Sequence, residues 1–464
     1  MLNVVNQFFQ SFGASVVVPI IIFIIAVCLR VRVKTALMSA LYAGVGLVGF
    51  SWVINEFTPV VTKVVNRMVD STGINLPIVD IGWQAGSLAS FSSSIGLTFF
   101  VISIVVELVL FACKLTRVFL PSNIWNNFSY MIWVTMAYYV THNYWLSMSL
   151  GFILMLYTLL FAETQANRWS KYYQIDNATV ASLHNIEQTV PAIILDPLWN
   201  ILRFNRVKLT PTTFKKKLGI WGEPITMGVI LGLLIGILAN LTRLTKMSAW
   251  GQIDQFAIQL AAVMTIFPLI TNVFAKAFLP LTEEINQRQA GNPQAGEKRW
   301  FLAVDDGVGY GEAATLMSGI ILIPIIVVMA FVLPGNQTLP VVDLVALPYM
   351  VESIVAISRG NILKVVATGF VWFSIGLYAS TWLGATYTAT LSKYGIAIPA
   401  GVALITSFNL MARPISALIF AAFISQNPIW IGVVIAIYLV LVYALRRYRP
   451  QIWAYLERMA AKNA

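Results

Sequence analysis

Residues 118–162 read VFLPSNIWNNFSYMIWVTMAYYVTHNYWLSMSLGFILMLYTLLFA, and this stretch contains no Asp, Glu, Lys or Arg. A transmembrane helix needs about 20 consecutive apolar residues. The stretch is therefore long enough for two membrane-spanning helices, with a break predicted near His142 and Asn143. A helix pair of this kind predicts an integral membrane protein.

Further apolar runs extend this prediction along the chain. Each lacks charged residues, and they occupy residues 12–29, 35–55, 85–106, 224–242, 255–275, 313–342 and 414–445. The chain has 464 residues, of which 58% are hydrophobic and only 11% are charged. Soluble domains usually carry about 25% charged residues. We therefore expect an all-α polytopic membrane protein with about eleven transmembrane helices and additional re-entrant hairpins.

Basic residues beside the first and last apolar runs predict the orientation. Arg30, Arg32 and Lys34 follow the first run, and arginines in residues 446–449 follow the last run. Positive charges accumulate on the cytoplasmic side of a membrane protein. We therefore expect the N-terminus outside, an odd number of crossings, and residues 446–464 as a cytoplasmic tail.

The formal net charge of +11 raises the alternative of a nucleic-acid partner. The positive residues lie instead in short groups beside apolar runs, as orientation and contact with the lipid bilayer require. We therefore expect no nucleic-acid partner. The densest basic group lies in residues 203–217 and is a candidate docking surface for an acidic protein. Cys28 and Cys113 fall within apolar runs and predict neither a disulfide framework nor a metal site.

The two halves of the chain share short motifs in the same order. The paired motifs are Val79-Asp80-Ile81-Gly82 with Val304-Asp305-Asp306-Gly307, Leu120–Asn123 with Leu333–Asn336, and Ser182-Leu183-His184-Asn185 with Ser407-Phe408-Asn409-Leu410. Transporters built from inverted repeats bind substrate near the bilayer midplane, where broken helices meet. We expect approximate repeats over residues 12–202 and 222–445. The glycine-rich residues 82–94 and 307–314 are then candidate broken helices facing a polar cavity.

Charged side chains within membrane segments are rare and usually face a cavity. The candidates at such positions are Asp80, Glu107, His184, Glu187, Asp305, Asp306, Glu312 and Glu352. Structural alternatives exist for three of them, namely pairing of Glu107 with Lys114 or with a backbone donor, pairing of Glu352 with Arg359, and helix capping by Asp80.

Asp305 and Asp306 are the strongest candidates for substrate contact. They precede Gly-Val-Gly-Tyr-Gly, which is not the sequence of an ordinary spanning helix. A carboxylate accepts hydrogen bonds from adjacent hydroxyls of a polyol. It also serves as a general base when a hydroxyl attacks a phosphoryl donor. His184, with Asn185 and Glu187 close by, forms a second polar group and a second candidate site.

His142 is the other histidine of the chain, and we expect it to be a satisfied core or interface residue. The sequence contains no Ser-His-Asp order, no set of metal ligands, no Walker loop and no dinucleotide fingerprint. We therefore expect no metal, no cofactor and no transport driven directly by ATP.

Several motifs, in order along the chain, are similar to those of one transporter family. They are VDIGW at residues 79–83, NIWN at residues 123–126, GEPIT at residues 222–226, LPGNQTLP at residues 333–340 and RGN at residues 359–361. These resemble the VDVGW, DIWN, GEPVT, VPGNxxLP and QGN segments of galactitol-type IIC subunits. Such subunits are the membrane components of bacterial sugar phosphotransferase systems.

The resemblance implies one IIC domain over residues 1–464, in the bacterial inner membrane. It also implies a homodimer in which each subunit has a core domain and a V-shaped scaffold domain. The homodimer would carry a polyol or related sugar by an elevator-like movement of the core. A separate cytoplasmic IIB protein supplies the phosphoryl group from a cysteine, with IIA as a further partner. Whether the chain is itself an enzyme therefore stays open. Residues 203–217 become the candidate face for IIB.

Residue by residue, the resemblance implies catalysis by Asp305 and His184. The implied substrate-binding residues and their polar neighbours are Asp80, Trp83, Gln84, His184, Asn185, Glu187, Asp305, Asp306, Asn361 and Asn409. The family has a histidine shortly after DIWN, whereas this chain reads Asn-Phe-Ser at residues 127–129, and Arg413 precedes a proline here. These departures leave open another polyol or a pentose as substrate. An ion-coupled secondary transporter of the same fold, without phosphorylation, is the alternative.

Overall fold

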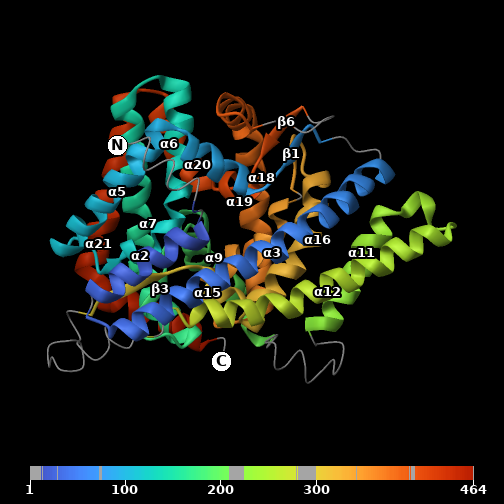
Figure 1. Cartoon of the computed structure of the whole chain (residues 1–464), viewed down its shortest axis with the longest axis horizontal. Coiled ribbons are helices and arrows are strands. Elements are labelled where there is room, and N and C mark those ends of the chain that lie inside the picture. Colours follow the sequence, from blue (N-terminus) through green and yellow to red (C-terminus); the bar gives the residue numbers. More distant parts are fainter. Residues whose placement is uncertain are drawn as a thin grey trace.

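The computed structural model describes residues 12, 14–28, 30–72, 76–207, 224–277, 280, 299–340, 342–396, 398 and 403–462. The described chain is predominantly helical, as the sequence predicts (Figure 1). Five of its helices are long and apolar enough to cross a membrane, namely α5 (Ser94–Ala112), α7 (Tyr144–Tyr173), α16 (Ala313–Val332), α18 (Ile362–Lys393) and α21 (Pro428–Ala461). Length and composition of these helices agree with the expected polytopic membrane protein.

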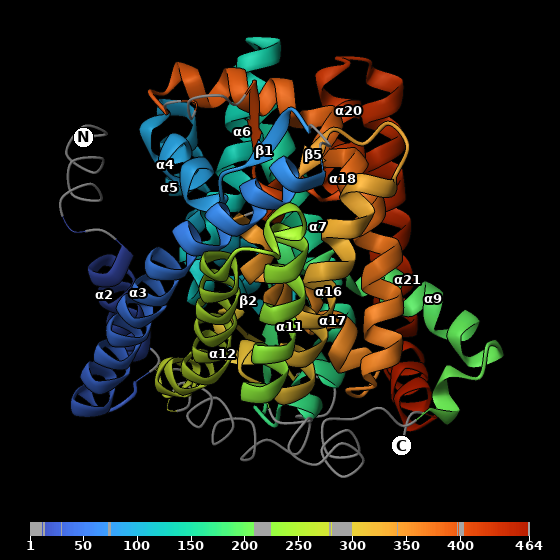
Figure 2. The ribbon, with the colours of Figure 1, turned by 90° about the vertical axis from the view of Figure 1, so that its right-hand side faces the viewer.

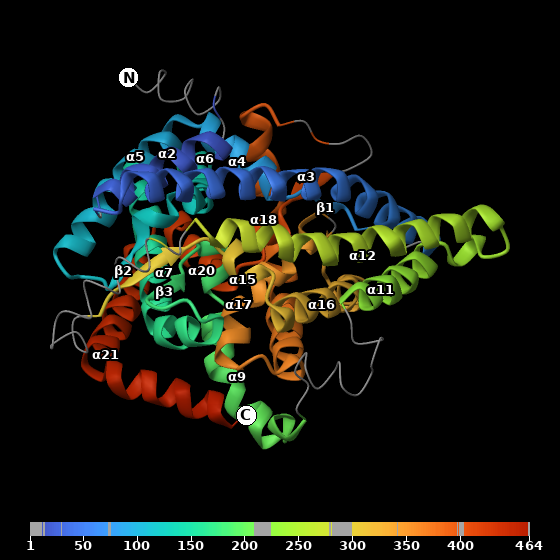
Figure 3. The same ribbon diagram turned by 60° about the horizontal axis from the view of Figure 1, so that its bottom comes forward.

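Four further long helices gather on one side of the molecule (Figures 2 and 3). They are α2 (Ala14–Cys28), α3 (Val33–Thr72), α11 (Pro224–Ala239) and α12 (Met247–Ala275). Helix α3 packs against the other three, and Arg67 Nη1 donates to Gln252 Oε1 of α12 at 2.7 Å. With 40 residues, α3 is about 60 Å long. It therefore exceeds the thickness of the hydrocarbon core and cannot stand upright within it.

The charge-free residues 118–162 contain two helices, α6 (Phe128–Thr141) and α7, and the predicted break is confirmed. His142 ends α6 with a left-handed φ of 52°. Asn143 begins α7 by accepting a hydrogen bond at Oδ1 from Leu146 N at 3.1 Å. His142 is exposed, and its role at the end of a helix agrees with the structural role expected for it.

Six short strands form two three-stranded parallel sheets, which the sequence pattern does not predict. Sheet A has the order β5–β1–β6 and consists of β5 (Thr338–Leu339), β1 (Ile78–Asp80) and β6 (Leu404–Thr406). Sheet B has the order β2–β4–β3 and consists of β2 (Val118–Phe119), β4 (Phe301–Val304) and β3 (Ala178–Val180). Strands this short show no alternation of apolar and polar residues. Each central strand comes from one half of the chain, and both of its neighbours come from the other half.

Short helices begin directly after four of the strands. Helix α4 (Trp83–Ser92) follows β1, α8 (Leu183–Ile186) follows β3, α15 (Gly307–Tyr310) follows β4, and α19 (Phe408–Met411) follows β6. The remaining short elements are α9 (Thr189–Ile201), α17 (Leu347–Ile357), α20 (Pro414–Ile424), η1 (Leu120–Asn127), η2 (Phe204–Arg206), η4 (Leu241–Arg243) and η5 (Val342–Ala346). Helix N-termini, with their unpaired N–H groups, therefore gather at the carboxyl edges of both sheets.

The two glycine-rich segments contain helix breaks, as expected. Helix α4 ends before Ser93, whose extended backbone separates it from α5. The single turn of α15 ends at Gly311, and Glu312 then caps α16 by accepting from Thr315 N at 2.9 Å. The break at Gly311 comes one turn of helix after the aspartates that follow β4, whereas the break at Ser93 lies at the far end of α4.

Candidate substrate-binding site

Both central strands end in an aspartate turn. Asp80 Oδ1 accepts a hydrogen bond from Gly82 N at 3.0 Å, and Asp305 Oδ1 accepts one from Gly307 N at 2.8 Å. Aspartate favours such turns because its side chain binds the backbone two residues further on. Gly82 adopts a φ of 93°, which residues with a side chain rarely adopt. The turns hold both carboxyl groups at the carboxyl edges of their sheets.

Polar side chains from several segments converge at the edge of sheet B. We call this group the B cluster, and it consists of Asn123, Asn126, Ser182, His184, Asn185, Asp305 and Asp306. Asn126 Nδ2 lies 2.8 Å from Asn123 Oδ1 and 3.0 Å from Asp305 Oδ2. Asn123 Nδ2 in turn donates to Ser182 Oγ at 3.1 Å. The amides therefore join the end of β4 to the segments that follow β2 and β3.

Asp306 accepts from three neighbours in the B cluster, one of which is Asn126, whose Nδ2 lies 3.4 Å from Asp306 Oδ1. His184 Nε2 lies 3.0 Å and Asn185 Nδ2 lies 2.6 Å from Asp306 Oδ2. All three side chains belong to buried residues. With the proton on Nε2, the Nδ1 atom of His184 is an acceptor. That Nδ1 and Oδ1 of Asn185 are buried and have no hydrogen-bond partner within the described chain. Buried polar atoms usually have partners, so these two atoms are candidate ligand contacts.

A second polar group lies at the edge of sheet A. We call it the A cluster, and it consists of Asp80, Asp343, Ser407 and Asn409. Asp80 Oδ2 accepts from Asp343 N at 2.7 Å, and Asp80 Oδ1 also accepts from Phe408 N at 3.2 Å. Asp343 accepts from Trp83 N at 3.0 Å and from Ser407 Oγ at 2.6 Å. Both carboxyl groups thus bind backbone at the starts of α4 and α19, which is the capping alternative for Asp80.

Asp343 is a buried member of this cluster that the sequence analysis did not single out. It directly follows the charge-free residues 313–342, so the sequence pattern places it at the polar end of an apolar run. Asp343 and Glu352 are the only charged residues within residues 313–357. An isolated acid in such an apolar segment is the signal that identifies it as a candidate.

Aromatic rings connect the two clusters. The Trp83 ring stacks on Phe128 with centroids 5.1 Å apart, and the Phe128 ring lies 5.7 Å from that of His184. Trp83 therefore has its backbone held by the A cluster and its ring directed toward the B cluster. Phe128 occupies one of the positions at which the chain departs from the family pattern.

Glu187 lies between the clusters and binds the start of α20. Its Oε1 accepts from Ser416 N at 2.6 Å, and its Oε2 accepts from Ile415 N at 3.1 Å. Ser416 Oγ also donates to Oε1. A carboxylate at a helix N-terminus is stabilised by the free N–H groups there. These contacts give Glu187 a helix-capping role in addition to its predicted place in the site.

Arg413 places a buried positive charge in the same region. Its Nε donates to Asn409 O at 2.6 Å and its Nη2 to Asn409 Oδ1 at 2.9 Å. Its Nη1 is buried without a hydrogen-bond partner in the part of the chain that is described. The guanidinium interacts electrostatically with Asp343 of the A cluster and Asp306 of the B cluster. The sequence analysis noted Arg413 only as a departure from the family.

Glu352 of α17 is a further buried acid near the B cluster. It interacts electrostatically with Asp305 and Asp306, and both of its carboxyl oxygens are buried without a hydrogen-bond partner among the described residues. A Cβ atom on Gly309 would lie 2.5 Å from Cδ of Glu352. Gly309 therefore lets α15 pack directly on this carboxyl group.

Two ion pairs considered as structural alternatives are not present among the described residues. Arg359 is exposed, whereas Glu352 is fully buried, so the described chain contains no pair between them. Glu107 accepts instead from Asn127 Nδ2 at 2.9 Å, and Lys114 is exposed. Sequence spacing alone does not show that a break or turn separates the two members of each pair, and both Arg359 and Lys114 have positive φ angles.

The remaining predicted site residues lie in different places. Asn409 belongs to the A cluster. Asn361 caps α18 by accepting from Lys364 N at 3.2 Å, and its Nδ2 donates to Val207 O at 3.2 Å, so its hydrogen bonds are separate from both clusters. Gln84 is in the first turn of α4, but its side chain lies outside the described part of the structure. Substrate binding by these residues stays a prediction.

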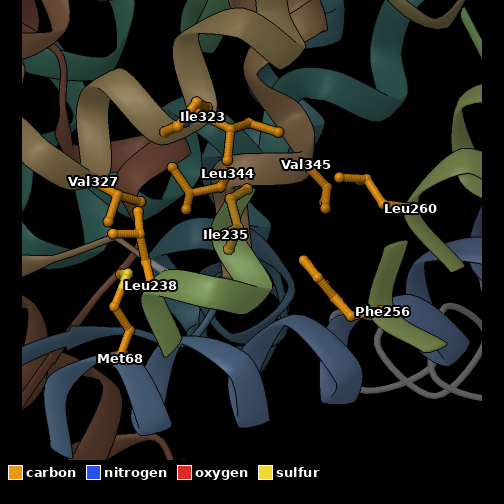
Figure 4. Close-up of a pocket in the computed structure, with 10 residues that line it drawn as sticks. Met68, Ile235, Leu238, Phe256, Leu260, Ile323, Val327, Leu344 and Val345 are labelled. Carbon is orange, nitrogen blue, oxygen red and sulfur yellow. The ribbon is translucent and has the colours of Figure 1, made fainter. Parts of the chain in front are cut away.

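An apolar cavity lies at one place where the long helices meet the rest of the bundle (Figure 4). Met68 of α3 and Leu238 of α11 line it on one side, and Val327 of α16 and Leu344 of η5 line it on the other. No polar atom lines this cavity, so it does not suit a polyol.

Among the described residues, no group of three or more His, Cys, Asp or Glu side chains is placed to hold a metal ion. The chemistry available in the B cluster is recognition of hydroxyl groups and acceptance of a proton.

A family model and several known proteins are similar to this chain. The model described as "PTS system sugar-specific permease component" matches residues 7–401. The "PTS system galactitol-specific EIIC component" of Escherichia coli (strain K12), and that of Escherichia coli O157:H7, are each 26% identical over 440 residues, or 95% of both chains. The "Putative permease IIC component" of Escherichia coli (strain K12) is 23% identical over 405 residues, which cover 87% of this chain and 90% of the relative.

Proposed function

The chain belongs to the family of phosphotransferase-system sugar-specific permease components, and from this membership we propose that it imports galactitol or a closely related polyol. It is a multi-pass protein of the inner membrane and works with IIA and IIB phosphotransferase proteins. Galactitol is the first substrate to consider, because two relatives that match almost end to end are named as specific for it. The departures at residues 127–129 and at Arg413 keep another polyol or a pentose in view.

The observation that carries this proposal is the B cluster. It combines carboxylates, amides and a histidine on buried strand ends. Carboxylates accept hydrogen bonds from hydroxyls, and amides both donate and accept. The free acceptor atoms of His184 and Asn185 are where a ligand would complete the hydrogen bonding. Asp305 is the more exposed of the two adjacent acids, so we assign it to substrate hydroxyls.

The proposed phosphorylation uses His184 as general base. Asp306 holds Nε2–H of the imidazole, which leaves Nδ1 to take the proton of a substrate hydroxyl. That hydroxyl oxygen forms a bond to the phosphorus carried by a cysteine of IIB, while the sulfur–phosphorus bond breaks and the thiolate leaves with IIB. Arg413 is a buried cation that interacts electrostatically with Asp306, and it would offset negative charge as the phosphoryl group arrives.

We also propose that the two halves form an inverted repeat. The exchange of β1, β2 and β3 with β4, β5 and β6 converts the strand order of sheet A into that of sheet B, which supports the proposal. Val79 pairs with Ile405, and its counterpart Val304 pairs with Val180. One motif pair needs correction, because Leu120–Asn123 follows β2 whereas Leu333–Asn336 precedes β5.

In the proposed transport cycle, α2, α3, α11 and α12 form the scaffold, and the helices around the two sheets form the moving core. The apolar cavity between them supports this division. Where two groups of helices meet through apolar side chains, one group can slide against the other without loss of hydrogen bonds. We propose an elevator movement, a homodimer, an outside N-terminus and a cytoplasmic C-terminus. The homodimer and the elevator rest on the family resemblance, and the orientation on the distribution of basic residues.

The decisive experiment uses sealed vesicles that contain the purified protein and the cognate phosphorylated IIB inside. Radiolabelled galactitol is added outside, and its phosphate ester is measured inside. We expect phosphorylated substrate only when phosphorylated IIB is present. A panel of other polyols and pentoses, tested in the same vesicles, ranks the substrates.

Vesicles with unphosphorylated IIB provide the control. Accumulation of unmodified polyol driven by a proton or sodium gradient, without phosphorylated IIB, would show the alternative ion-coupled transporter and contradict the proposal. Absence of any polyol uptake, together with phosphorylation of another sugar, would retain the family role and reject the polyol assignment.

A further inference from the structure

A strongly basic pocket lies at the end of α5, away from both clusters. Its charged lining residues are Lys114, Arg117, Glu163, Arg446 and Arg449, so four positive groups face one negative group. The empty volume is about 1240 Å³. Phe111 and Trp300 form an aromatic wall, with their ring centroids 5.3 Å apart. The pocket therefore combines a positive field with an apolar surface.

The single acid does not neutralise this pocket. Glu163 Oε1 pairs with Arg449 Nη2 at 2.5 Å, and Glu163 Oε2 accepts from Arg117 N at 3.1 Å. Arg446 Nη2 donates to the carbonyl of Leu115 at 2.8 Å, and no acid of the described residues pairs with it. Lys114 has no acidic partner within the described chain. Among the described residues, the positive charges of Lys114 and Arg446 are thus not neutralised by an acid and can meet an anion.

An apolar groove continues from the basic pocket. The two cavities share Leu115, Thr116, Glu163 and Arg446. The groove has an empty volume of about 870 Å³, and α5, α7 and α21 line it with residues that include Leu110, Leu156, Leu159, Leu439, Val442 and Leu445. These three helices are all candidate membrane spans. The groove therefore lies where acyl chains of the bilayer are present.

We propose that the pocket and groove bind an anionic phospholipid, with its phosphate among Lys114, Arg446 and Arg449 and one acyl chain along the groove. Residues 414–445 are free of charge, and the arginines begin at 446, so the pocket lies where the apolar part of α21 ends. Basic pockets between transmembrane helices recognise anionic headgroups through this arrangement. A free phosphate or an acidic protein surface would leave the adjoining apolar groove empty.

The position of the site also suggests what the lipid stabilises. Arg117 O accepts from Phe301 N at 2.7 Å, and Phe301 is the first residue of β4, which leads to Asp305. Helix α21 departs from helical geometry at Tyr448, beside the pocket. A bound headgroup would therefore join the start of sheet B to the bend in α21. The lipid is expected to raise the melting temperature of the protein.

Native mass spectrometry of the full chain in a neutral detergent tests the proposal. The probes are dioleoyl-phosphatidylglycerol, dioleoyl-phosphatidylcholine and glycerol 3-phosphate. We expect retention of the anionic lipid over the zwitterionic one. The double variant Lys114→Gln/Arg446→Gln should lower this preference by about tenfold or more, since each basic group near an anionic headgroup contributes about 1 kcal/mol. The control Arg447→Gln/Arg458→Gln removes two charges from α21 outside the pocket and should leave the preference unchanged.

A groove variant separates a lipid from a free anion. Leu439→Trp fills the groove at an exposed position (58%) and should weaken binding of the lipid, but not of glycerol 3-phosphate. Equal binding of glycerol 3-phosphate and the lipid, unaffected by Leu439→Trp, would overturn the proposal in favour of an anion site. Unchanged lipid binding in the charge variant, with weaker phosphoryl transfer from IIB, would instead show a protein-docking surface. Size-exclusion profiles verify folding, and Leu439→Trp decides the question if the charge variant does not fold.

Discussion

His184 and Asp306 lie 122 residues apart in the sequence and 3.0 Å apart in the structure. Both residues were candidates from the sequence, with Asp305 and Asp306 together as the strongest candidates for substrate contact. In the structure Asp306 orients His184 and Asn185, whereas Asp305 binds Gly307 N and Asn126. The two adjacent acids share Asn126 but differ in their other partners, and we expect them to differ in role.

At this scale we predict that His184→Gln lowers IIB-dependent phosphorylation by about a hundredfold or more. Glutamine keeps a donor for Asp306 but cannot take a proton, so substrate binding should change far less than the turnover rate. Turnover and apparent affinity are measured with the vesicle assay. His142→Gln is the matched control, because Gln174 and Gln426 show that glutamine tolerates the same positive φ. Equal loss in both variants would show that His184 has no special role.

At the scale of elements, the B cluster depends on the close packing of α15 and α17. Gly309 lies in the turn that directly follows the aspartate pair, and the carboxyl group of Glu352 fills the space where its side chain would be. The short helix is therefore held in place by packing with a helix from more than 40 residues further along, and not by its own length, because a single turn has little helical stability.

We predict that Gly309→Ala lowers the melting temperature, because an added methyl group in a full core typically costs about 1–3 kcal/mol. Combining it with Glu352→Asp shortens the opposing side chain and should restore part of the loss. Thermal unfolding in detergent measures both effects. Gly251→Ala is the control, since no atom lies within 4 Å of its added Cβ, and alanine favours a helix. A stable Gly309→Ala protein would contradict the packing described for Glu352.

At the scale of the whole molecule, helices α2, α3, α11 and α12 form one group, which packs against the bundle that contains both sheets through contacts of α12 with α15 and of α11 with α16 (Figure 2). Within the first group, Ser71 Oγ of α3 donates to Leu238 O of α11 at 3.0 Å. Met68 and Val327, one from each group of helices, both line the apolar cavity (Figure 4). The two groups of helices are the candidates for the parts that move against each other.

We predict that a covalent link between Met68→Cys and Val327→Cys, made with a short reversible thiol cross-linker, stops transport. Cys28 and Cys113 are exposed and are first replaced by alanine. Transport is measured before linking, after linking and after release by a reductant. A link between Met68→Cys and Leu238→Cys, within one group, should leave transport intact. Full transport by the linked 68–327 protein would exclude relative movement of the two groups.

The sequence by itself determined that this protein is a helical membrane protein of a sugar-permease family. Span length and charge distribution depend on local composition, because the bilayer acts on each segment separately. It also marked Asp305, Asp306 and His184 as candidate site residues, because ionisable groups in apolar segments are few. The break at His142 was likewise readable from the local polar residues in a long apolar stretch.

Only the tertiary structure decided which of these residues meet. The sheets join strands from opposite halves, so the contacts of Asp343, Arg413 and Glu352 depend on chain crossings that no local pattern records. The oxygens of Asp80 likewise bind the backbone of three segments, and its contact with substrate stays a prediction. The physical reason is that a buried polar group must find partners, and in this fold the partners come from distant parts of the chain.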